Sequence, residues 1–487
     1  MNQTNQPNKF YVTTSIPYAN ARPHLGHAME FINADVMARY YRGRGADVRF
    51  QIGTDEHGQK LFEAAEQAGE EARPFVNRMS ETFSRLAQDL NISHDYFVRT
   101  TDDAHKLGAQ KLWQACQDDI YKGEYKGLYC VACELFYTTK DAVDDCCPVH
   151  PNRQLQELAI ESYFLKLGKY QDRLIEVIEN DEYRVFPGLR KNEVLSFLRN
   201  NELQDLSISR PKSQLEWGVE VPGDSEHVMY VWFDALANYI TTVGYGYDAD
   251  ELARWWPADL HIVGKDISRF HAVYWPIMLM SAGLELPKAL YVHGFINAAG
   301  GVKMSKSLGN SVEPSEAIAK YGVDALRYYL LREIPSDGDG EFGLERFGSV
   351  YNSDLANGLG NLVQRVASMT VKYCNGQFSV GDTVDRSEVD RFLTDCAFDR
   401  ALDYIFTFVR SSNQKIEESK PWELAKTNPE SVAELLNDLI TEILWVSRAL
   451  EPFLPATASK IQATFKDGKV DAGIGILFPR VETDLAE

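Results

Sequence analysis

The feature that most constrains the fold of this chain is a repeated order of a short apolar segment, a polar cluster and a helix. Residues 10–14 are β-branched and aromatic, as in a strand, and they are followed by a turn and by apolar residues at helical spacing up to Gly43. A second strand is expected at residues 48–52, and the same order returns at residues 260–263 and 290–292. Strands that alternate with helices predict an α/β fold with a doubly wound parallel sheet of Rossmann type.

Polar residues follow each of these predicted strands. Ligands of doubly wound sheets bind beyond the carboxyl ends of the strands, so residues that come directly after a strand are candidates for a binding site. In chain order, the candidates are His24, His27, Asp55, Lys265, Asp266 and His293. We expect these side chains to converge. The alternative for Asp55 is a helix cap, and Asp266 and His293 could also be purely structural.

Two short motifs carry groups that suit phosphate. His24-Leu25-Gly26-His27 stands where the first helix begins, and its two imidazoles share one face near the positive end of the helix dipole. There they could stabilise charge that develops on phosphate oxygens. In the second motif, Lys303-Met304-Ser305-Lys306-Ser307, glycines precede two ammonium groups, which is typical of a loop that closes over a ligand. The alternatives are a pair of surface or capping histidines and a solvated basic turn.

The cysteines are clustered, because four of the seven lie between Cys130 and Cys147. Cys130 and Cys133 form one pair with a two-residue spacer, and Cys147 and His150 form a second pair further along the chain. This spacing predicts a tetrahedral Zn²⁺ site with four protein ligands, in which the metal is structural. Cys146 could take the place of Cys147, although the spacing of Cys147 to His150 mirrors that of the first pair. Free thiols or a redox pair are the alternative.

The charge balance limits the possible partners. A formal net charge of −21 and a pI of about 5.0 argue against nonspecific coating of DNA or RNA, but they leave room for a specific RNA docked on a local basic path. The longest nearly uncharged apolar segment, residues 272–283, is shorter than the ~20 residues that span a bilayer. Residues 1–8 resemble neither a signal peptide nor a transit peptide. We therefore expect a cytoplasmic protein with no membrane or DNA partner.

Read in chain order, the motifs resemble those of class I aminoacyl-tRNA synthetases and, within that class, those of the methionyl-tRNA synthetase family. Besides the histidine and lysine motifs, the resemblance rests on four segments: Ile16-Pro17-Tyr18-Ala19-Asn20, Gly53-Thr54-Asp55-Glu56-His57-Gly58, Val231-Trp232-Phe233-Asp234-Ala235-Leu236 and Lys420-Pro421-Trp422. It runs from Tyr11 to the C-terminal helical region, which is almost the whole chain.

This resemblance implies a methionine–tRNA ligase. ATP and methionine would give methionyl-adenylate and pyrophosphate, with Mg²⁺ carried by the phosphates, and methionine would then pass to the 3′-terminal adenosine of initiator and elongator methionine tRNAs. The carboxylate of methionine is already a nucleophile, so adenylation requires alignment and charge stabilisation rather than a general base. The methionine pocket should be apolar and aromatic, with one carboxylate for the ammonium group.

The resemblance also implies roles for individual residues. The catalytic residues would be His24, His27, Lys303 and Lys306. The residues at ATP would be Asn20, Gly26, Lys265, Asp266, His293, Gly294, Met304, Ser305 and Ser307. Those at methionine would be Ile16, Tyr18, Asp55, Trp232, Ala235, Leu236, Tyr239, Phe270 and His271, with Asp55 pairing with the ammonium group. Ordinary core packing is the alternative for the aromatic residues, and some family members have proline at the position of Leu236.

The expected domains follow from the periodicity and the resemblance together. Residues 1–115 and 228–296 would be the two halves of the catalytic Rossmann domain, and residues 116–227 the connective insertion with the single zinc site. Residues 297–350 would contact the tRNA stem and carry the lysine motif. Residues 351–487 have helical periodicity almost throughout, which predicts an all-α bundle that binds the anticodon.

Four residues of the predicted bundle would read the CAU anticodon by resemblance, namely Asn357, Asn361, Arg365 and Trp422. Single-stranded bases are recognised by stacking on aromatic rings and by hydrogen bonds from amides and guanidinium groups. The alternative is an ordinary polar helix face and one partly buried tryptophan. We expect the chain to be a monomer, because it ends soon after the bundle.

Two other classes of protein share parts of this pattern. A nucleotidyltransferase could use the histidine motif to transfer adenylate to a cofactor precursor, but it would not need the long helical C-terminus. A noncatalytic tRNA-binding relative would not need the two histidines and two lysines, which are all present. Within the class, the enzymes for leucine, isoleucine and valine carry a far larger insertion than residues 116–227, and the enzyme for cysteine uses zinc in its amino-acid pocket.

Overall fold

The computed structural model describes residues 9–130, 135–137, 142, 145–148, 153–304, 312–381, 385, 387–471, 473 and 475–482. By its internal contacts the chain divides into two compact units. Unit 1 comprises Met1–Pro23, Ala46–Arg85 and His94–Val292, and unit 2 comprises His24–Gly45, Leu86–Ser93 and His293–Glu487. Each unit is therefore assembled from three separate stretches of the sequence.

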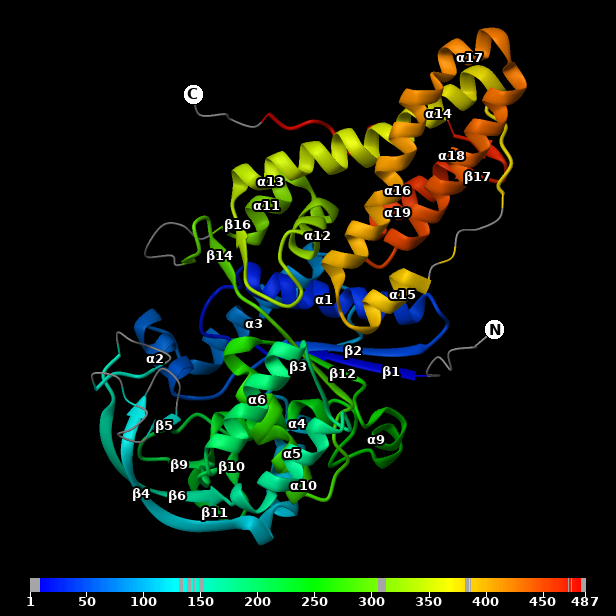
Figure 1. The fold of residues 1–487 in the computed structure, drawn as a ribbon. Coiled ribbons are helices and arrows are strands. Elements are labelled where there is room, and N and C mark those ends of the chain that lie inside the picture. The colour runs from blue at the N-terminus through cyan, green and yellow to red at the C-terminus, as the bar shows by residue number, and fades with distance from the viewer. Residues whose placement is uncertain are drawn as a thin grey trace. The chain divides into compact units, whose positions relative to one another are not determined.

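A six-stranded sheet in the order β3-β2-β1-β12-β13-β7 forms the centre of unit 1 (Figure 1). The pairs β3–β2, β2–β1, β1–β12 and β13–β7 are parallel. The chain passes from β1 to β2 and β3 on one side, and it places β12 and β13 on the other side, beyond which β7 forms the edge. The doubly wound α/β fold predicted from the sequence is therefore confirmed. The strands are β1 (Lys9–Thr14), β2 (Asp47–Thr54), β3 (Tyr96–Arg99), β7 (Arg184–Phe186), β12 (Leu260–Gly264) and β13 (Ala289–His293).

Helices cover this sheet and bury one continuous apolar cluster with it. The cluster contains Tyr11 of β1, Trp113 of α4, Val263 of β12 and Trp275 of α10, all buried. Strands of a parallel sheet that are covered by helices are buried on both faces, and β12 is buried along its whole length. The helices that accompany this sheet in the sequence are α2 (Gln59–Ala68), α3 (Ala72–Asp89), α4 (Asp103–Ala115), α7 (Val231–Leu236), α8 (Asn238–Thr241), α9 (Ala249–Trp255) and α10 (Trp275–Ser281). Three shorter helical segments are the 3-10 turns η1 (Gln117–Asp119) and η3 (Lys265–Ile267) and the π-helix η4 (Phe270–Tyr274).

A second sheet of unit 1 is antiparallel and comes from the residues predicted as the insertion. Its order is β5-β4-β6-β8, with β4 (Ile120–Cys130) and β6 (Gln156–Leu165) paired from Ile120 opposite Leu165 to Tyr129 opposite Gln156. The other elements of this region are β5 (Leu135–Tyr137), β8 (Leu206–Ser207), β9 (Ser209–Pro211), β10 (Glu220–Val221), β11 (Asp224–Met229), η2 (Gly168–Tyr170), α5 (Gln171–Glu179) and α6 (Gly188–Asn200). The same region also supplies β7, which pairs with β13 in the parallel sheet.

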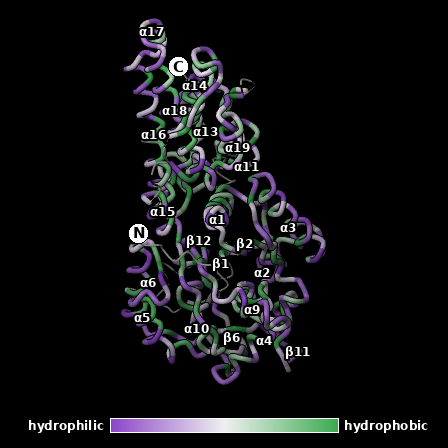
Figure 2. The backbone as a smooth tube through the Cα atoms, turned by 90° about the vertical axis from the view of Figure 1, so that its right-hand side faces the viewer, coloured by the Kyte–Doolittle hydropathy of each residue, from purple (hydrophilic) through white to green (hydrophobic). Residues whose placement is uncertain are grey.

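Unit 2 is largely helical, as the periodicity predicts. The apolar residues at helical spacing, such as Leu359, Ile405 and Leu439, are all buried, and α14, α16 and α18 pack side by side (Figure 1). Figure 2 shows hydrophobic and hydrophilic residues alternating along α16 and α18, as expected of helices that bury one face. The helices are α1 (Leu25–Arg42), α11 (Pro314–Tyr321), α12 (Val323–Arg332), α13 (Leu344–Val350), the π-helix η6 (Tyr351–Gly360), α14 (Asn361–Cys374), α15 (Ser387–Thr394), α16 (Phe398–Ser419), α17 (Pro421–Thr427), α18 (Pro429–Leu450) and α19 (Pro455–Thr464).

Two small sheets complete unit 2. The first has the order β15-β14-β16, formed by β14 (Ile296–Ala298), β15 (Val302–Lys303) and β16 (Gly340–Phe342), and the second pairs β17 (Phe465–Lys466) with β18 (Lys469–Val470). In the part of the chain that the structure describes, we find no helix with the length and apolar character required to cross a membrane.

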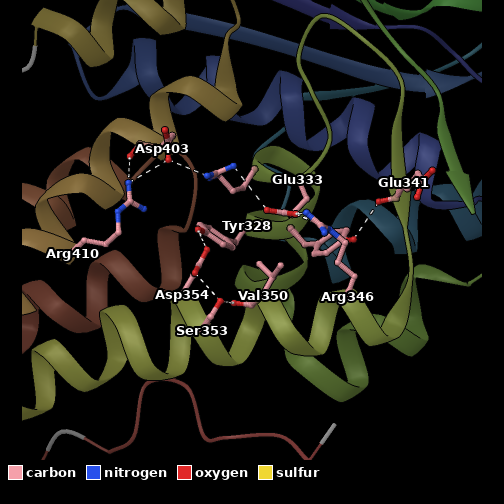
Figure 3. Close-up of polar contacts among 11 residues, drawn as sticks. Tyr328, Glu333, Glu341, Arg346, Val350, Ser353, Asp354, Asp403 and Arg410 are labelled. Atoms are coloured by element: carbon pink, nitrogen blue, oxygen red, sulfur yellow. Dashed lines mark hydrogen bonds and ion pairs between the residues drawn. The ribbon is translucent and has the colours of Figure 1, made fainter. Parts of the chain in front are cut away.

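Polar contacts attach the π-helix η6 to its neighbours (Figure 3). The hydroxyl group of Tyr328 on α12 donates a hydrogen bond of 2.8 Å to Asp354, and Ser353 donates another to the same carboxylate. On α16, Asp403 forms ion pairs with Arg332 of α12, at 3.0 Å, and with Arg410. These contacts link α12, η6 and α16 through charged groups as well as through the apolar core.

Candidate functional site

The carboxylate of Asp55 lies at the carboxyl end of β2, where the sequence places a binding residue. Its backbone N–H donates to the carbonyl oxygen of Pro17 at 2.9 Å, and its carbonyl oxygen accepts from the N–H of Ala19 at 2.8 Å. The side chain is buried, and its Oδ1 accepts a hydrogen bond of 3.3 Å from the backbone N–H of His57. Asp55 is therefore oriented by the backbone on both sides, as expected of a preorganised binding group.

The residue next to it, Glu56, anchors this loop to the rest of unit 1. Its buried carboxylate accepts two hydrogen bonds from Arg99, at 2.6 and 2.9 Å, and one from Thr101. Its carbonyl oxygen accepts a hydrogen bond from the indole N–H of Trp217. A bidentate arginine–carboxylate pair is among the strongest side-chain contacts, so the segment that carries Asp55 is held rigidly.

Aromatic side chains gather on α7, α8 and η4. Trp232 stacks on Phe270 with ring centroids 3.6 Å apart, and the ring of Tyr18 meets Trp232 edge to face at 6.3 Å. The hydroxyl group of Tyr239 is 2.6 Å from Nε2 of His271, whose Nδ1 lies 2.9 Å from the carbonyl oxygen of Ile267. Because a carbonyl oxygen only accepts, Nδ1 carries the proton and the Tyr239 hydroxyl donates to Nε2.

This places five of the predicted methionine-pocket residues in mutual contact. Ala235 and Leu236 of α7 are buried beside them, and Leu236 belongs to the same apolar cluster. Ile16 and Asn20 lie after β1 and are partly buried, and the predicted ATP residues Lys265 and Asp266 begin the turn η3 directly after β12.

In unit 2, His24 and His27 hold each other at the start of α1. His24 is the N-cap residue, and its Nδ1 accepts from the N–H of Gly26 at 3.1 Å, while Nδ1 of His27 accepts from the N–H of His24 at 3.2 Å. The two rings are stacked with centroids 3.8 Å apart. Since both Nδ1 atoms accept, each neutral ring carries its proton on Nε2.

Burial lowers the pKa of His27 well below its usual value of 6.5, and the nearby His24 and His293 lower it further. His27 is therefore neutral at pH 7, in agreement with its acceptor role at Nδ1. The position of Gly26 also favours glycine for a steric reason, because a Cβ atom there would lie 2.9 Å from Cε1 of His24.

His293 ends β13 and is bound through both ring nitrogens. Its Nδ1 is 2.8 Å from the carbonyl oxygen of Gly294, and its Nε2 is 3.0 Å from the carboxylate of Glu30 on α1. Both partners are oxygen atoms from different segments of unit 2, so together they fix the orientation of the ring. A Cβ atom on Gly294 would lie 2.0 Å from the carbonyl oxygen of Gly338, which requires glycine there.

Glu30 is absent from the residues that the sequence analysis selected. The signal that could have found it is its spacing, since a residue three positions after His27 lies on the same face of α1.

The lysine motif begins in the described part of the structure and continues outside it. Lys303 pairs with Asn297 through β15 and β14, after a turn in which Gly300 and Gly301 both have positive φ, of 79° and 74°. That conformation favours glycine at both positions. Met304 is partly buried. The predicted residues Ser305, Lys306 and Ser307 lie outside the described residues.

The predicted zinc ligands are described in part. Cys130 ends β4 and Cys147 follows a short bridge between Cys146 and Gln154, and the N–H of Cys147 donates to the carbonyl oxygen of Arg153 at 3.0 Å. Cys133 and His150 lie outside the described residues. Within the ranges that are described, no group of three or more potential metal ligands comes together.

The predicted anticodon residues lie on three elements of unit 2. Asn357 belongs to η6, Asn361 and Arg365 to α14, and Trp422 to α17, which begins at Pro421 as the sequence predicts. Trp422 is 40% exposed, which is unusual for so large an apolar ring. Arg365 forms an ion pair of 2.7 Å with Glu417 of α16. Asn357, Asn361 and Arg365 are four residues apart, which would place them on one face of a continuous α-helix, but Asn357 lies in the π-helix η6.

A C-terminal segment, residues 475–482, lies along η6, and we call it the C-terminal strap. Tyr351 donates a hydrogen bond to the carbonyl oxygen of Pro479, and Asn352 exchanges two hydrogen bonds with the backbone of Val481. Nε of Arg480 donates to Oδ1 of Asn357 at 2.8 Å. The strap therefore contacts one of the predicted anticodon residues directly.

Comparison with known proteins identifies close relatives along nearly the whole chain. The family model "tRNA synthetases class I (M)" matches residues 10–159 and 152–367. The methionine–tRNA ligase of Clostridium acetobutylicum is 42% identical, over 98% of this chain and 79% of the relative, and that of Brucella suis is 43% identical, over 93% and 91%. The solved structure of Mycobacterium tuberculosis methionyl-tRNA synthetase in complex with methionyl-adenylate has a TM-score of 0.91 at 38% identity, covering 97% of this chain and 100% of that one.

Proposed function

The chain belongs to the methionyl-tRNA synthetase family of class I aminoacyl-tRNA synthetases, and from this premise we propose which residues bind each substrate and which stabilise the transition state. As a methionine–tRNA ligase it activates methionine with ATP, releasing pyrophosphate, and then transfers methionine to tRNA. In the first step an oxygen of the methionine carboxylate attacks the α-phosphorus of ATP, and the bond to the bridging oxygen of pyrophosphate breaks.

The proposed methionine site is built around Asp55 and the aromatic rings of unit 1. Asp55 pairs with the ammonium group, which leaves the carboxylate of the substrate available to react. Tyr18, Trp232, Ala235, Leu236, Tyr239, Phe270 and His271, with Ile16, surround the thioether. The stacked Trp232 and Phe270 and the buried Tyr239–His271 hydrogen bond support this proposal, because they form an apolar surface with few polar groups.

The proposed role of His24 and His27 is to donate hydrogen bonds from Nε2 to phosphate oxygens. Charge increases on these oxygens as the pentavalent transition state forms, so donors placed in advance stabilise the transition state more than the ground state. The N-terminus of α1 adds the positive end of its dipole. Lys303 and Lys306 would bring further positive charge to the β- and γ-phosphates, and Mg²⁺ bound to these phosphates would neutralise part of their charge.

The remaining ATP residues are proposed to hold the nucleoside and the phosphates. Asp266 and His293 stand at the ends of β12 and β13, where doubly wound sheets bind nucleotides, and Asn20, Gly26, Lys265, Gly294, Met304, Ser305 and Ser307 complete the set. Glu30 joins this proposal as a positioning residue, because its carboxylate holds the ring of His293.

We also propose a structural Zn²⁺ held by Cys130, Cys133, Cys147 and His150. Cys130 and Cys147 are each only 1% exposed, whereas Cys146 is partly exposed, so the burial favours Cys147 over Cys146 as the third thiolate. Three thiolates and one imidazole suit tetrahedral zinc and leave no open position for catalysis.

For the transfer step, Asn357, Asn361, Arg365 and Trp422 are proposed to recognise the anticodon of methionine tRNAs. The exposure of Trp422 supports a stacking role, since an exposed ring offers a face to a base. We further propose that the chain works as a monomer in the cytoplasm, where the tRNAs that it charges are used.

The observation that carries the proposal is the set of aromatic and carboxylate groups in a chain that is related to methionine–tRNA ligases along almost its entire length. ATP–pyrophosphate exchange tests the substrate. We expect exchange with methionine and none with leucine, isoleucine, valine or cysteine, followed by charging of methionine tRNA. Exchange that depends on another amino acid and not on methionine would overturn the proposal.

A further inference from the structure

A buried chain of three ionisable groups lies beside the proposed methionine site and has no part in the reaction as derived above. Asp234 on α7 is 1% exposed, and each of its carboxylate oxygens faces an imidazole nitrogen. Oδ2 is 2.6 Å from Nδ1 of His57, and Oδ1 is 2.7 Å from Nε2 of His105. The other nitrogen of His105 lies 3.0 Å from the hydroxyl oxygen of Thr241. All these groups belong to unit 1.

The chain of contacts joins the two segments that supply opposite ends of the substrate site. His57 stands two residues after Asp55, and its backbone N–H donates directly to the Asp55 carboxylate. Asp234 stands two residues after Trp232 and one before Ala235. The bond between His57 and Asp234 therefore connects the group proposed for the ammonium to the helix proposed for the thioether.

The surrounding charges favour an ionised Asp234. Burial alone would raise the pKa of this carboxyl, but the two histidines more than compensate and hold the pKa at about 2. An ionised carboxylate only accepts, so both imidazoles must donate to it: His57 through Nδ1–H and His105 through Nε2–H. This assignment sets the orientation of both rings, and a neutral substitute at Asp234 cannot accept from both.

We propose that Asp234 is a positioning residue for methionine recognition, which acts through His57 to hold the Asp55 carboxylate at the substrate ammonium group. This inference rests on the proposed role of Asp55. A buried N–H group that loses its acceptor destabilises the arrangement by about the free energy of desolvating that group. Disturbing the hydrogen bond between His57 and Asp234 should therefore weaken methionine binding about tenfold or more.

The test compares ligands that have and lack the amine. Equilibrium dialysis measures the Kd of methionine, of methioninol, which has the amine but no carboxylate, and of 4-(methylthio)butanoate, which has no amine. In Asp234→Asn, we expect the Kd of methionine and methioninol to rise about tenfold or more, and the Kd of 4-(methylthio)butanoate to stay unchanged. An equal rise for all three ligands would show a merely structural role, and no rise would refute the inference.

Two histidine variants keep the test decisive even if Asp234→Asn does not fold. His57→Asn places an amide N–H where Nδ1–H stands and should preserve binding, whereas His57→Gln moves the donor one bond further and should weaken it. Equal Kd values in the two variants would overturn the inference. A matched control is Asp119→Asn, because Asp119 is also a buried aspartate of unit 1, bound by Lys169, Tyr170 and Ser281, and has no contact with this chain of groups.

The failure of the inference is separable from the failure of the proposed function. Asp55→Asn should weaken methionine binding on its own. If it does not, the role proposed for Asp55 is wrong. If Asp55→Asn weakens binding and Asp234→Asn does not, only the positioning role of Asp234 is refuted.

Discussion

Arg327 of α12 and Asp35 of α1 form an ion pair of 2.7 Å in which both side chains are completely buried. The guanidinium also donates to the carbonyl oxygens of Leu90, Pro452 and Phe453, and the carboxylate also accepts from Arg39 and Ser93. Four of the five N–H donors of the guanidinium and both oxygens of the carboxylate are thus used, and a buried ion pair is tolerated when its remaining polar groups are hydrogen-bonded. The pair links α1, which begins with the histidine motif, to the C-terminal helices within unit 2.

The first prediction concerns stability. Arg327→Met leaves the Asp35 carboxylate buried beside only one partly exposed arginine, and it removes the donors to three carbonyl oxygens. We expect the free energy of unfolding to fall by about 3–5 kcal/mol. Urea denaturation measures this. Arg39→Met is the control, because Arg39 pairs with the same carboxylate at 2.7 Å but is partly exposed, and its loss should cost less than about 1 kcal/mol. Similar losses in the two variants would contradict the prediction.

The second prediction concerns acid. The pKa of Asp234 is about 2 in the folded chain against an ordinary 3.8, because the charges and hydrogen bonds of His57 and His105 outweigh the effect of burial. The folded state therefore releases this proton more readily than the unfolded state. Its contribution to stability is complete above pH 3.8 and is lost as the pH falls toward 2. Urea unfolding at a series of pH values should show a steeper decline for the wild type than for Asp234→Asn in this range. Parallel declines would refute the assignment.

The third prediction separates capping from catalysis at His27. Asn at this position keeps an acceptor for the N–H of His24 but loses the donor at Nε2, whereas Gln keeps a donor near Nε2 and loses the acceptor. We expect His27→Asn to lower the rate of ATP–pyrophosphate exchange about a hundredfold with little change in stability. His27→Gln should keep more of the rate and lose about 1 kcal/mol of stability. The reverse pattern would show that the ring acts mainly as a cap.

The fourth prediction concerns zinc. Cys147→Ser should lose the metal because Cys147 is the buried cysteine of the adjacent pair, while Cys146→Ser should keep one zinc per chain. Elemental analysis of protein purified without chelators measures the content. If zinc is retained in Cys147→Ser and lost in Cys146→Ser, Cys146 is the ligand and Cys147 is not. Absence of zinc from the wild type would refute the proposed site.

The fifth prediction concerns tRNA. Glu417 pairs with Arg365 and adds negative charge where a phosphate backbone or a base would approach. Glu417→Gln should therefore tighten binding of methionine tRNA by about two- to fivefold, as measured by filter binding at constant salt. Glu418→Gln makes the same change of charge one residue away, where the carboxylate is bound by Gln414, and should have a smaller effect. Equal effects of the two substitutions would indicate that tRNA binding responds to the net charge of the protein and not to the release of Arg365 from its ion pair.

Much of the sheet of unit 1 could be predicted from the sequence, because its strands contain short runs rich in β-branched and aromatic residues that are followed by polar residues. The strands at β1, β2, β12 and β13 and the helix α1, with Gly43 at its C-terminus, were found in this way. β7 was not found. It has three residues, too few to show a period, and it joins the sheet only through pairing with β13, which is distant in sequence.

The site was predictable where function depends on short motifs and unpredictable where it depends on contacts between segments. His24, His27 and Asp55 were selected by their positions after predicted strands, and the family resemblance supplied their roles. These roles remain proposals, as do those of predicted residues outside the described ranges, such as Lys306 and His150. Glu30 and Asp234 were not selected, because each becomes informative only when its partner, His293 or His57, is known. The π-helix η6 was also not foreseen, since its apolar spacing is compatible with an α-helix.

The C-terminal strap has a consequence for the chemical preference of Asn357. A carboxamide can read a base through its oxygen or through its amino group, but the guanidinium of Arg480 already engages the oxygen. If Asn357 contacts a base as proposed, its amino group is the part of the side chain that this bond leaves for recognition, and the C-terminal strap would bias Asn357 toward acceptor atoms of that base.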